Sequence, residues 1–202
     1  MKKILFALSA LAILFTGCTI EQEYTFHENW SGTYLTRVDL TSMAALSGGE
    51  EESQPLLNDT MVSELQTKYE AIPGITNVQT SGKDNILLSG FDFSSTDALN
   101  AAFKPEDGAA TSSNLLSFER KGKKGLVVKV DKSAMGEEAA AGTEQMGEMI
   151  TFKIALRFDK KIKKIKSKVA TLDKENNIVH LEFNFTQLSD KNVDLNTEIT
   201  LK

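Results

Sequence analysis

Residues 75–103 read ITNVQTSGKDNILLSGFDFSSTDALNAAF, and this segment indicates the fold class. Its first two thirds predict a β-hairpin, with strands over 75–80 and 86–93 and a turn rich in Gly, Asp and Asn. Ser94 or Ser95 then caps a short helix. On the second strand, three apolar residues share one face, as a period of two requires: Leu87, Phe91 and Phe93.

The chain before this segment has the same order of elements. A hairpin is expected over 20–40, and a helix over 59–71 with Asn58 or Asp59 as its cap. Two strand pairs, each followed by a helix, predict an α+β unit over 18–104, with two helices on one face of an antiparallel sheet.

The remaining residues, 105–202, predict a β-rich C-terminal part. A third hairpin spans 115–130 and turns at the sequence GKKG. The further strands are expected over 150–158, 165–172, 178–185 and 198–201. The fold class is therefore α+β, in which an antiparallel sheet with two helices is followed by a mostly antiparallel β part. This second part forms either a separate unit or one continuous domain with the first.

The first residues have the pattern of a secretory signal. Lys2 and Lys3 precede an apolar run over 4–15, and Thr16 and Gly17 follow it. The run is about a dozen residues long, whereas a membrane-spanning helix needs about 20. Residues 1–17 are therefore predicted to be a signal peptide that is removed.

The sequence Phe15-Thr16-Gly17-Cys18 resembles the lipobox of bacterial lipoproteins, in the Bacteroidetes type that has Phe in place of the usual Leu. Cys18 is the only cysteine, so an exported chain cannot use it for an internal disulfide. The resemblance implies that Cys18 carries the lipid that attaches the protein to a membrane. Because Thr19 follows, rather than Asp, it implies the outer membrane of the cell envelope, on either its periplasmic or its surface face.

The charge of the mature chain argues against nucleic acid as a partner. Removal of residues 1–17 leaves 185 residues with 21 basic and 28 acidic side chains, a net charge of −7. Phosphates repel a chain of this sign. The remaining partners to consider are the membrane itself and an envelope protein or lipid.

Motifs that carry chemistry are absent from the sequence. His27 and His180 lie far apart and have no cysteine partners, so a zinc site is not expected. The acidic run over 50–52 fits a solvated loop better than a calcium site. Nucleophile elbows and phosphate-binding loops are also missing. We therefore expect no cofactor, no metal and no enzymatic activity.

Lysines are concentrated in one segment of this acidic chain: Lys160, Lys161, Lys163, Lys164, Lys166 and Lys168. Lys121, Lys123 and Lys124 lie on a separate hairpin. If the fold brings both groups together, they form a positive surface that contacts anionic lipid headgroups. The simpler interpretation is an exposed edge strand whose lysines prevent pairing with other chains.

Phenylalanines recur in the predicted strands: Phe91, Phe93, Phe118, Phe152, Phe183 and Phe185. They could line a lipid cavity, but ordinary core packing explains them more simply.

The mature chain also resembles the LppM-type lipoproteins, a family of unknown biochemical activity. The resemblance rests on short motifs: Tyr24-Thr25-Phe26, Ser31-Gly32-Thr33, Val38-Asp39-Leu40 and Phe158-Asp159-Lys160-Lys161-Ile162. It implies a short hairpin directly after the lipid-bearing cysteine, and contact of some members with envelope lipids.

Three functions follow from these observations. The first is a non-enzymatic interaction or scaffolding lipoprotein, favoured by the anchor and the missing motifs. The second is a binder of envelope lipid or glycolipid, through the lysine-rich face or an apolar cleft. The third is an enzyme with an unfamiliar active site, which a cleft containing paired carboxylates or a histidine would indicate.

Overall fold

A computed structural model describes residues 18–42, 44, 57–104, 115–132 and 150–202, and the fold is reported for these residues. The larger sheet contains β1 (Cys18–Phe26), β2 (Gly32–Asp39), β3 (Ile75–Lys83), β4 (Ile86–Phe93), β7 (Ile150–Phe158), β9 (Ala170–Asp173) and β10 (Ile178–Asn184). The smaller sheet contains β5 (Leu116–Lys121), β6 (Gly125–Val130), β8 (Ile162–Lys166) and β11 (Thr197–Leu201). The helices are α3 (Asp59–Glu70), α4 (Thr96–Ala102) and α7 (Phe185–Ser189).

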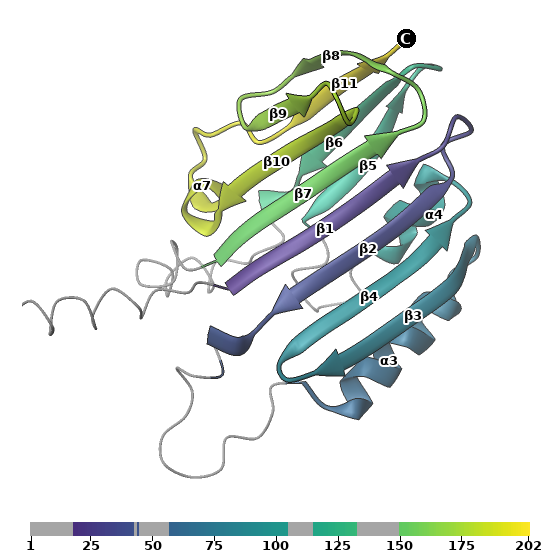
Figure 1. The fold of residues 1–202 in the computed structure, drawn as a ribbon, viewed down its shortest axis with the longest axis vertical. Coiled ribbons are helices and arrows are strands. Elements are labelled where there is room, and N and C mark those ends of the chain that lie inside the picture. Colours follow the sequence, from purple (N-terminus) through teal and green to yellow (C-terminus); the bar gives the residue numbers. More distant parts are fainter. Residues whose placement is uncertain (1–17, 43, 45–56, 105–114, 133–149) are drawn as a thin grey trace, which may run out of the picture.

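The α+β class predicted from the sequence is confirmed, but the larger sheet is mixed. Its strand order is β3-β4-β2-β1-β7-β10-β9, and that of the smaller sheet is β5-β6-β11-β8. β1 pairs antiparallel with β2 on one side and parallel with β7 on the other. The sequence predicted an antiparallel sheet over 18–104 and a mostly antiparallel C-terminal part, but it did not predict this parallel contact, because no local turn connects β1 with β7. Strands from 18–104 and from 105–202 thus lie in one sheet (Figure 1).

The N-terminal caps of α3 and α4 lie where the sequence predicted the two helices to begin. The side chain of Asn58 accepts a hydrogen bond from the backbone N–H of Met61 at 2.9 Å and begins α3. The hydroxyl of Ser95 accepts one from the backbone N–H of Ala98 at 3.2 Å and begins α4. Asn58 and Ser95 are therefore the caps, since each satisfies a backbone donor that has no partner within its helix.

Two strand predictions need correction. The strand expected over 165–172 is two strands, β8 and β9, in different sheets. Between them, Ser167 Oγ accepts hydrogen bonds from two backbone N–H groups and holds a turn. The strand expected to end at Phe185 ends one residue earlier, because Asn184 and Gln187 form a reciprocal capping box that begins α7. Short polar side chains caused both differences, and hydrophobic patterns do not detect them.

The core lies behind the larger sheet, where α3, α4, β5 and β6 are seen in Figure 1. No described helix or strand covers the front face. At the centre of the core, the ring centroid of Tyr24 lies 4.8 Å from the ring centroid of Phe118 in the smaller sheet. It lies 5.0 Å from the ring centroid of Tyr34 in β2. Aromatic packing therefore joins the two sheets.

One buried polar side chain serves two of these tyrosines. The Tyr24 hydroxyl donates to Gln22 Oε1 at 3.2 Å, and Gln22 Nε2 donates to the Tyr34 hydroxyl at 3.3 Å. Burial raises the pKa of Tyr24 and of Tyr34 well above the usual value. It also raises the pKa of Tyr69, which packs against Phe91, to about 12.

Candidate functional site

The front face of the larger sheet carries a groove of about 940 Å³ over β1, β2, β4 and β3. Side chains on a strand alternate between its two faces, so the residues that line this groove are the neighbours of core residues. We call it the outer groove and define it by the residues that the argument uses: Glu21, Glu23, Leu35, Arg37, Leu88 and Gly90.

Two leucines form the apolar part of the outer groove. Leu35 is 57% exposed and Leu88 is 47% exposed. Leu35 faces Gly90 across the pairing of β2 with β4, and a Cβ atom placed on Gly90 would lie only 2.5 Å from Leu35 Cδ2. The missing side chain of Gly90 therefore makes room for Leu35 to lie across the sheet. Two exposed leucines on an otherwise polar face form an apolar surface suited to a partner.

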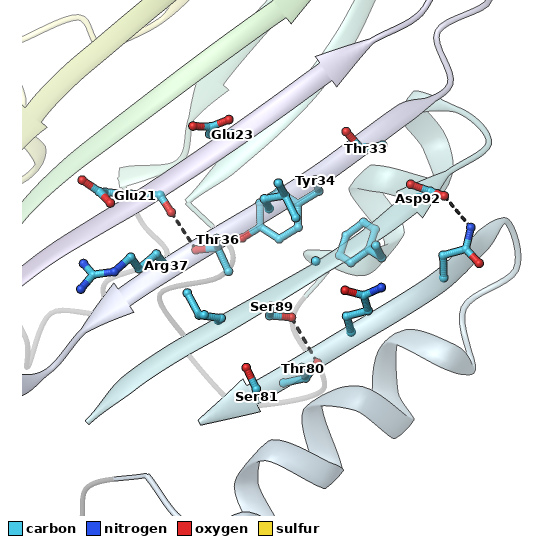
Figure 2. A pocket seen from close by; sticks show the side chains of 16 residues that line it. Glu21, Glu23, Thr33, Tyr34, Thr36, Arg37, Thr80, Ser81, Ser89 and Asp92 are labelled. Carbon is cyan, nitrogen blue, oxygen red and sulfur yellow. Dashed lines mark hydrogen bonds between the residues drawn. The ribbon is translucent and has the colours of Figure 1, made fainter. Parts of the chain in front are cut away.

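Charged side chains surround these leucines. Figure 2 shows Glu21 and Arg37 near one end of the groove and Asp92 near the other. Arg37 Nη2 lies 2.9 Å from Asp39 Oδ2, and Glu23 Oε2 lies 3.8 Å from Arg157 Nε. The rim thus contains both signs of charge. This arrangement suits recognition of an apolar group with polar flanks.

The two histidines occupy separate exposed positions in the described part of the chain. There, no group of three His, Cys, Asp or Glu side chains is arranged to hold a metal ion. His27 Nδ1 lies 3.0 Å from Asp159 Oδ2 in an exposed contact between two turns, whereas His180 is exposed on β10. The fold does not bring the two histidines together at one site.

Cys18 is the first residue of β1 and lies opposite Ile150 of β7. Only 4% of its surface is exposed. Burial, and secondly the negative charge of Asp39, raise the pKa of its thiol. The signal peptide predicted over 1–17 lies outside the described residues, so lipid attachment at Cys18 stays a prediction. Within the described residues, no helix has the length and apolar character needed to cross a membrane.

The two lysine groups meet at one end of the smaller sheet. The backbone N–H of Leu201 donates to the carbonyl of Lys124 at 2.8 Å, and that of Lys202 donates to the carbonyl of Lys161 at 2.9 Å. The final residues of the chain therefore connect the β5–β6 turn with the start of β8.

The six lysines predicted as a possible lipid contact do not all lie at this end. Lys161, Lys163 and Lys164 are exposed there, while Lys166 ends β8 and Lys168 lies beyond it. Lys160 is half-buried, and its Nζ lies 3.2 Å from Glu28 Oε2.

The strand phenylalanines are part of the core, as the simpler interpretation predicted. All six are buried in the main hydrophobic cluster. Phe152 and Phe183, for example, stack at 5.3 Å between ring centroids on neighbouring strands. On the opposite face of the sheet, the apolar side chains of Leu35 and Leu88 are instead exposed to a ligand.

One feature of the sequence indicates the exposed leucines of the outer groove. Leu87 and Leu88 are adjacent on a strand, so one of them must face away from the core. Leu35 likewise interrupts the polar face of β2, between Thr33 and Arg37. Which face stays uncovered depends on where the smaller sheet packs, and that arrangement is not a local property.

No protein-family model and no curated protein sequence matches the chain. Among solved structures, the chain is similar to the NMR structure of the folded domain of LppM from Mycobacterium tuberculosis, with 11% sequence identity and a TM-score of 0.44. The match covers 93% of this chain and 92% of that one. At this identity and TM-score the likeness is a distant one.

Proposed function

We propose that this protein is a lipid-anchored, non-enzymatic interaction module of the cell envelope, attached to the outer membrane through Cys18 and binding an envelope partner in its outer groove. The observation that carries the proposal is the pair of exposed leucines, Leu35 and Leu88, on the uncovered face of the sheet. Apolar side chains exposed to water contribute no hydrophobic stabilisation, whereas the same side chains stabilise a complex when a partner covers them.

The anchor and the groove are close to each other in the fold. Cys18 begins β1, so no spacer separates the proposed lipid from the sheet. Glu21 of the groove follows three residues later, which is roughly 10 Å along a strand. A partner in the groove would therefore lie near the membrane surface, as expected for another envelope component.

The apolar contribution of this surface is modest. Complete burial of a leucine side chain contributes about 1.5–3 kcal/mol, and these two are about half buried already. Covering both would contribute roughly 2 kcal/mol in total. The charged rim must then supply orientation and specificity, which fits a reversible contact.

Site-specific photocrosslinking in the native envelope tests the proposal. A photoreactive residue in place of Leu35 or Leu88 should give a discrete adduct. The same residue in place of His180, on the front face but outside the groove, is the matched control. Leu88→Asp combined with the probe at position 35 should abolish the adduct. Equal adducts from all three positions, or none, would contradict docking in the groove.

Binding of an envelope lipid or glycolipid is the second candidate, favoured by the volume of the groove. About 940 Å³ is within the range of roughly 300–1,000 Å³ typical of small-ligand sites. Native mass spectrometry of the chain purified from an envelope extract distinguishes the two. A lipid-sized adduct that disappears in Leu35→Asp/Leu88→Asp would favour the lipid, and an adduct-free mass would favour a protein partner.

A further inference from the structure

The end of the smaller sheet described above has a concentrated positive charge. We call it the basic end and define it by six exposed lysines: Lys121, Lys123, Lys124, Lys161, Lys163 and Lys164. The backbone bonds from Leu201 to Lys124 and from Lys202 to Lys161 hold the β5–β6 turn beside the start of β8. The six charges therefore gather at one end of the smaller sheet, although they come from two distant segments.

Most of these charges are not neutralised by the protein. Lys121 Nζ lies 3.3 Å from Glu198 Oε1, but within the described part of the chain the other five lysines make no ion pair. The neighbouring carboxylates have partners of their own: Asp159 contacts His27 and Glu28 contacts Lys160. In a chain of net charge −7 after removal of residues 1–17, this is a strong local separation of charge.

The basic end lies at the opposite end of the molecule from Cys18. β1 runs from Cys18 to Phe26, whose carbonyl accepts a hydrogen bond from the backbone N–H of Asp159 at 3.1 Å, two residues before Lys161. In Figure 1, the start of β1 and the C-terminus lie at opposite ends of the larger sheet. A strand of this length spans about 26 Å, whereas screening limits charge interactions to about 8 Å in physiological salt.

We propose that the basic end binds a second anionic phospholipid surface, facing the membrane that holds Cys18, so that the protein connects two membrane surfaces. The inference rests on the proposed attachment through Cys18. It differs from contact with the anchoring membrane, because an upright β1 places the lysines beyond the reach of that membrane's headgroups.

The chemistry of the basic end favours lipid headgroups over other polyanions. Its segments, 121–124 and 160–166, contain no arginine and no aromatic residue. Lysine acts as a point charge without the fork geometry that recognises a fixed phosphate or carboxylate, and without a ring on which sugars or bases stack. Mobile anionic lipids can gather beneath such charges without a fixed geometry. Each lysine near an anionic surface strengthens binding about fivefold.

Vesicle capture tests the proposal with the full lipidated chain. The protein is inserted into neutral phosphatidylcholine vesicles, which are mixed with labelled vesicles containing phosphatidylglycerol. The anchored protein should capture the anionic vesicles, and capture should fall steeply with added salt. Lys124→Glu/Lys161→Glu/Lys163→Glu should weaken capture by about a hundredfold or more. Lys83→Glu/Lys104→Glu/Lys191→Glu, which changes the net charge equally at exposed positions outside the basic end, should capture as the wild type does.

Two readouts separate the possible failures. Retention of the protein on its own neutral vesicles reports the anchor, and capture of the second population reports the basic end. Retention without capture overturns this inference and leaves the proposed anchor intact, whereas loss from the neutral vesicles overturns the anchor. Equal capture by both triple variants also overturns the inference. So does binding to an anionic polysaccharide without vesicle capture, which would reassign the surface to a glycan.

Discussion

Gly32 shows how much a single residue contributes to the closure of the first hairpin. It begins β2 opposite Phe26, and a Cβ atom at this position would lie 1.7 Å from the carbonyl oxygen of Thr25 and 2.8 Å from Phe93 Cζ. The oxygen of Thr25 belongs to the backbone, so this contact cannot be relieved by rotation of a side chain. The absence of a side chain at Gly32 thus allows β1 and β2 to approach each other at the edge of the core.

We expect Gly32→Ala to destabilise the protein by about 3 kcal/mol, at the upper end of the cost of overpacking. Chemical denaturation checks this value. Gly122→Ala is the control, because Gly122 has a φ of +68° but nothing within 4 Å of its Cβ position. Its cost should be limited to the left-handed backbone, about 1 kcal/mol. Equal losses for the two variants would show that the contacts of Gly32 relax at little cost.

The thiol of Cys18 should be unreactive in the folded, unlipidated chain. Burial and the charge of Asp39 raise its pKa, so little thiolate exists at neutral pH. With a chromogenic disulfide reagent, we expect the folded chain to react at least about tenfold more slowly than the chain in denaturant. Asp39→Asn should accelerate the reaction of the folded chain, because it removes the negative charge that disfavours the thiolate. A native rate equal to the denatured rate would contradict the buried position.

At the scale of elements, α4 protects an exposed strand edge. β5 is the edge strand of the smaller sheet, and its Phe118 has a backbone donor and acceptor that no neighbouring strand pairs. Asn100 of α4 supplies both partners: its Nδ2 donates to the Phe118 carbonyl at 2.8 Å, and its Oδ1 accepts from the Phe118 N–H at 2.8 Å. One side chain thus acts as a strand partner.

Asn100→Ala should therefore destabilise the protein by about 2–3 kcal/mol, since it leaves two part-buried backbone groups without partners. Amide hydrogen exchange should show the loss first at Phe118. Asn176→Ala is the matched control, because the exposed Asn176 donates to Asp173 Oδ2 at 2.8 Å within a surface turn, and its loss should cost less than about 1 kcal/mol. Unchanged protection at Phe118 would contradict the role of Asn100.

Elements with a local cause were predictable from the sequence, and those with a distant cause were not. Asn58 and Ser95 act within one turn of their own helices, so the sequence limited each cap to one of two adjacent residues. The parallel pairing of β1 with β7 depends on the packing of the whole chain, and the break between β8 and β9 depends on the small hydroxyl of Ser167. The lysine clusters were evident, but their meeting depended on the course of β11 between them.

At the scale of the whole molecule, ionisation of tyrosine should limit stability at high pH. The chain has three tyrosines, and Tyr24, Tyr34 and Tyr69 are all buried. Burial raises the pKa of each, that of Tyr69 to about 12. An unfolded tyrosine ionises near pH 10, so the unfolded state loses protons first as the pH rises. The contribution of the buried tyrosines to the free energy of unfolding is therefore fully present below about pH 10 and is lost as the pH rises above it.

Alkaline titration should consequently show no early tyrosinate step. We expect the ultraviolet absorbance of tyrosinate and the far-ultraviolet circular dichroism to change together, in one transition above about pH 10. Tyr69→Phe should move the midpoint of alkaline unfolding to higher pH, when variant and wild type are equally stable at neutral pH. The variant has one tyrosine fewer whose ionisation favours the unfolded state. A tyrosine that ionises before the dichroism changes would show that the cluster is accessible to water.

The pairing of the first strand with β7 also sets the order of events during synthesis. His27 and Asp159, which follow β1 and β7, are 132 residues apart. β1 therefore cannot complete its pairing until most of the chain has been made, and contacts between such distant segments form slowly. Until then, β1 can pair only with β2, and Cys18 lies at the open end of this hairpin, without its β7 neighbour Ile150. Closure of the sheet buries Cys18, so the proposed acylation of its thiol would have to precede that closure. A mutation that accelerates folding should then reduce the fraction of chains that carry the lipid.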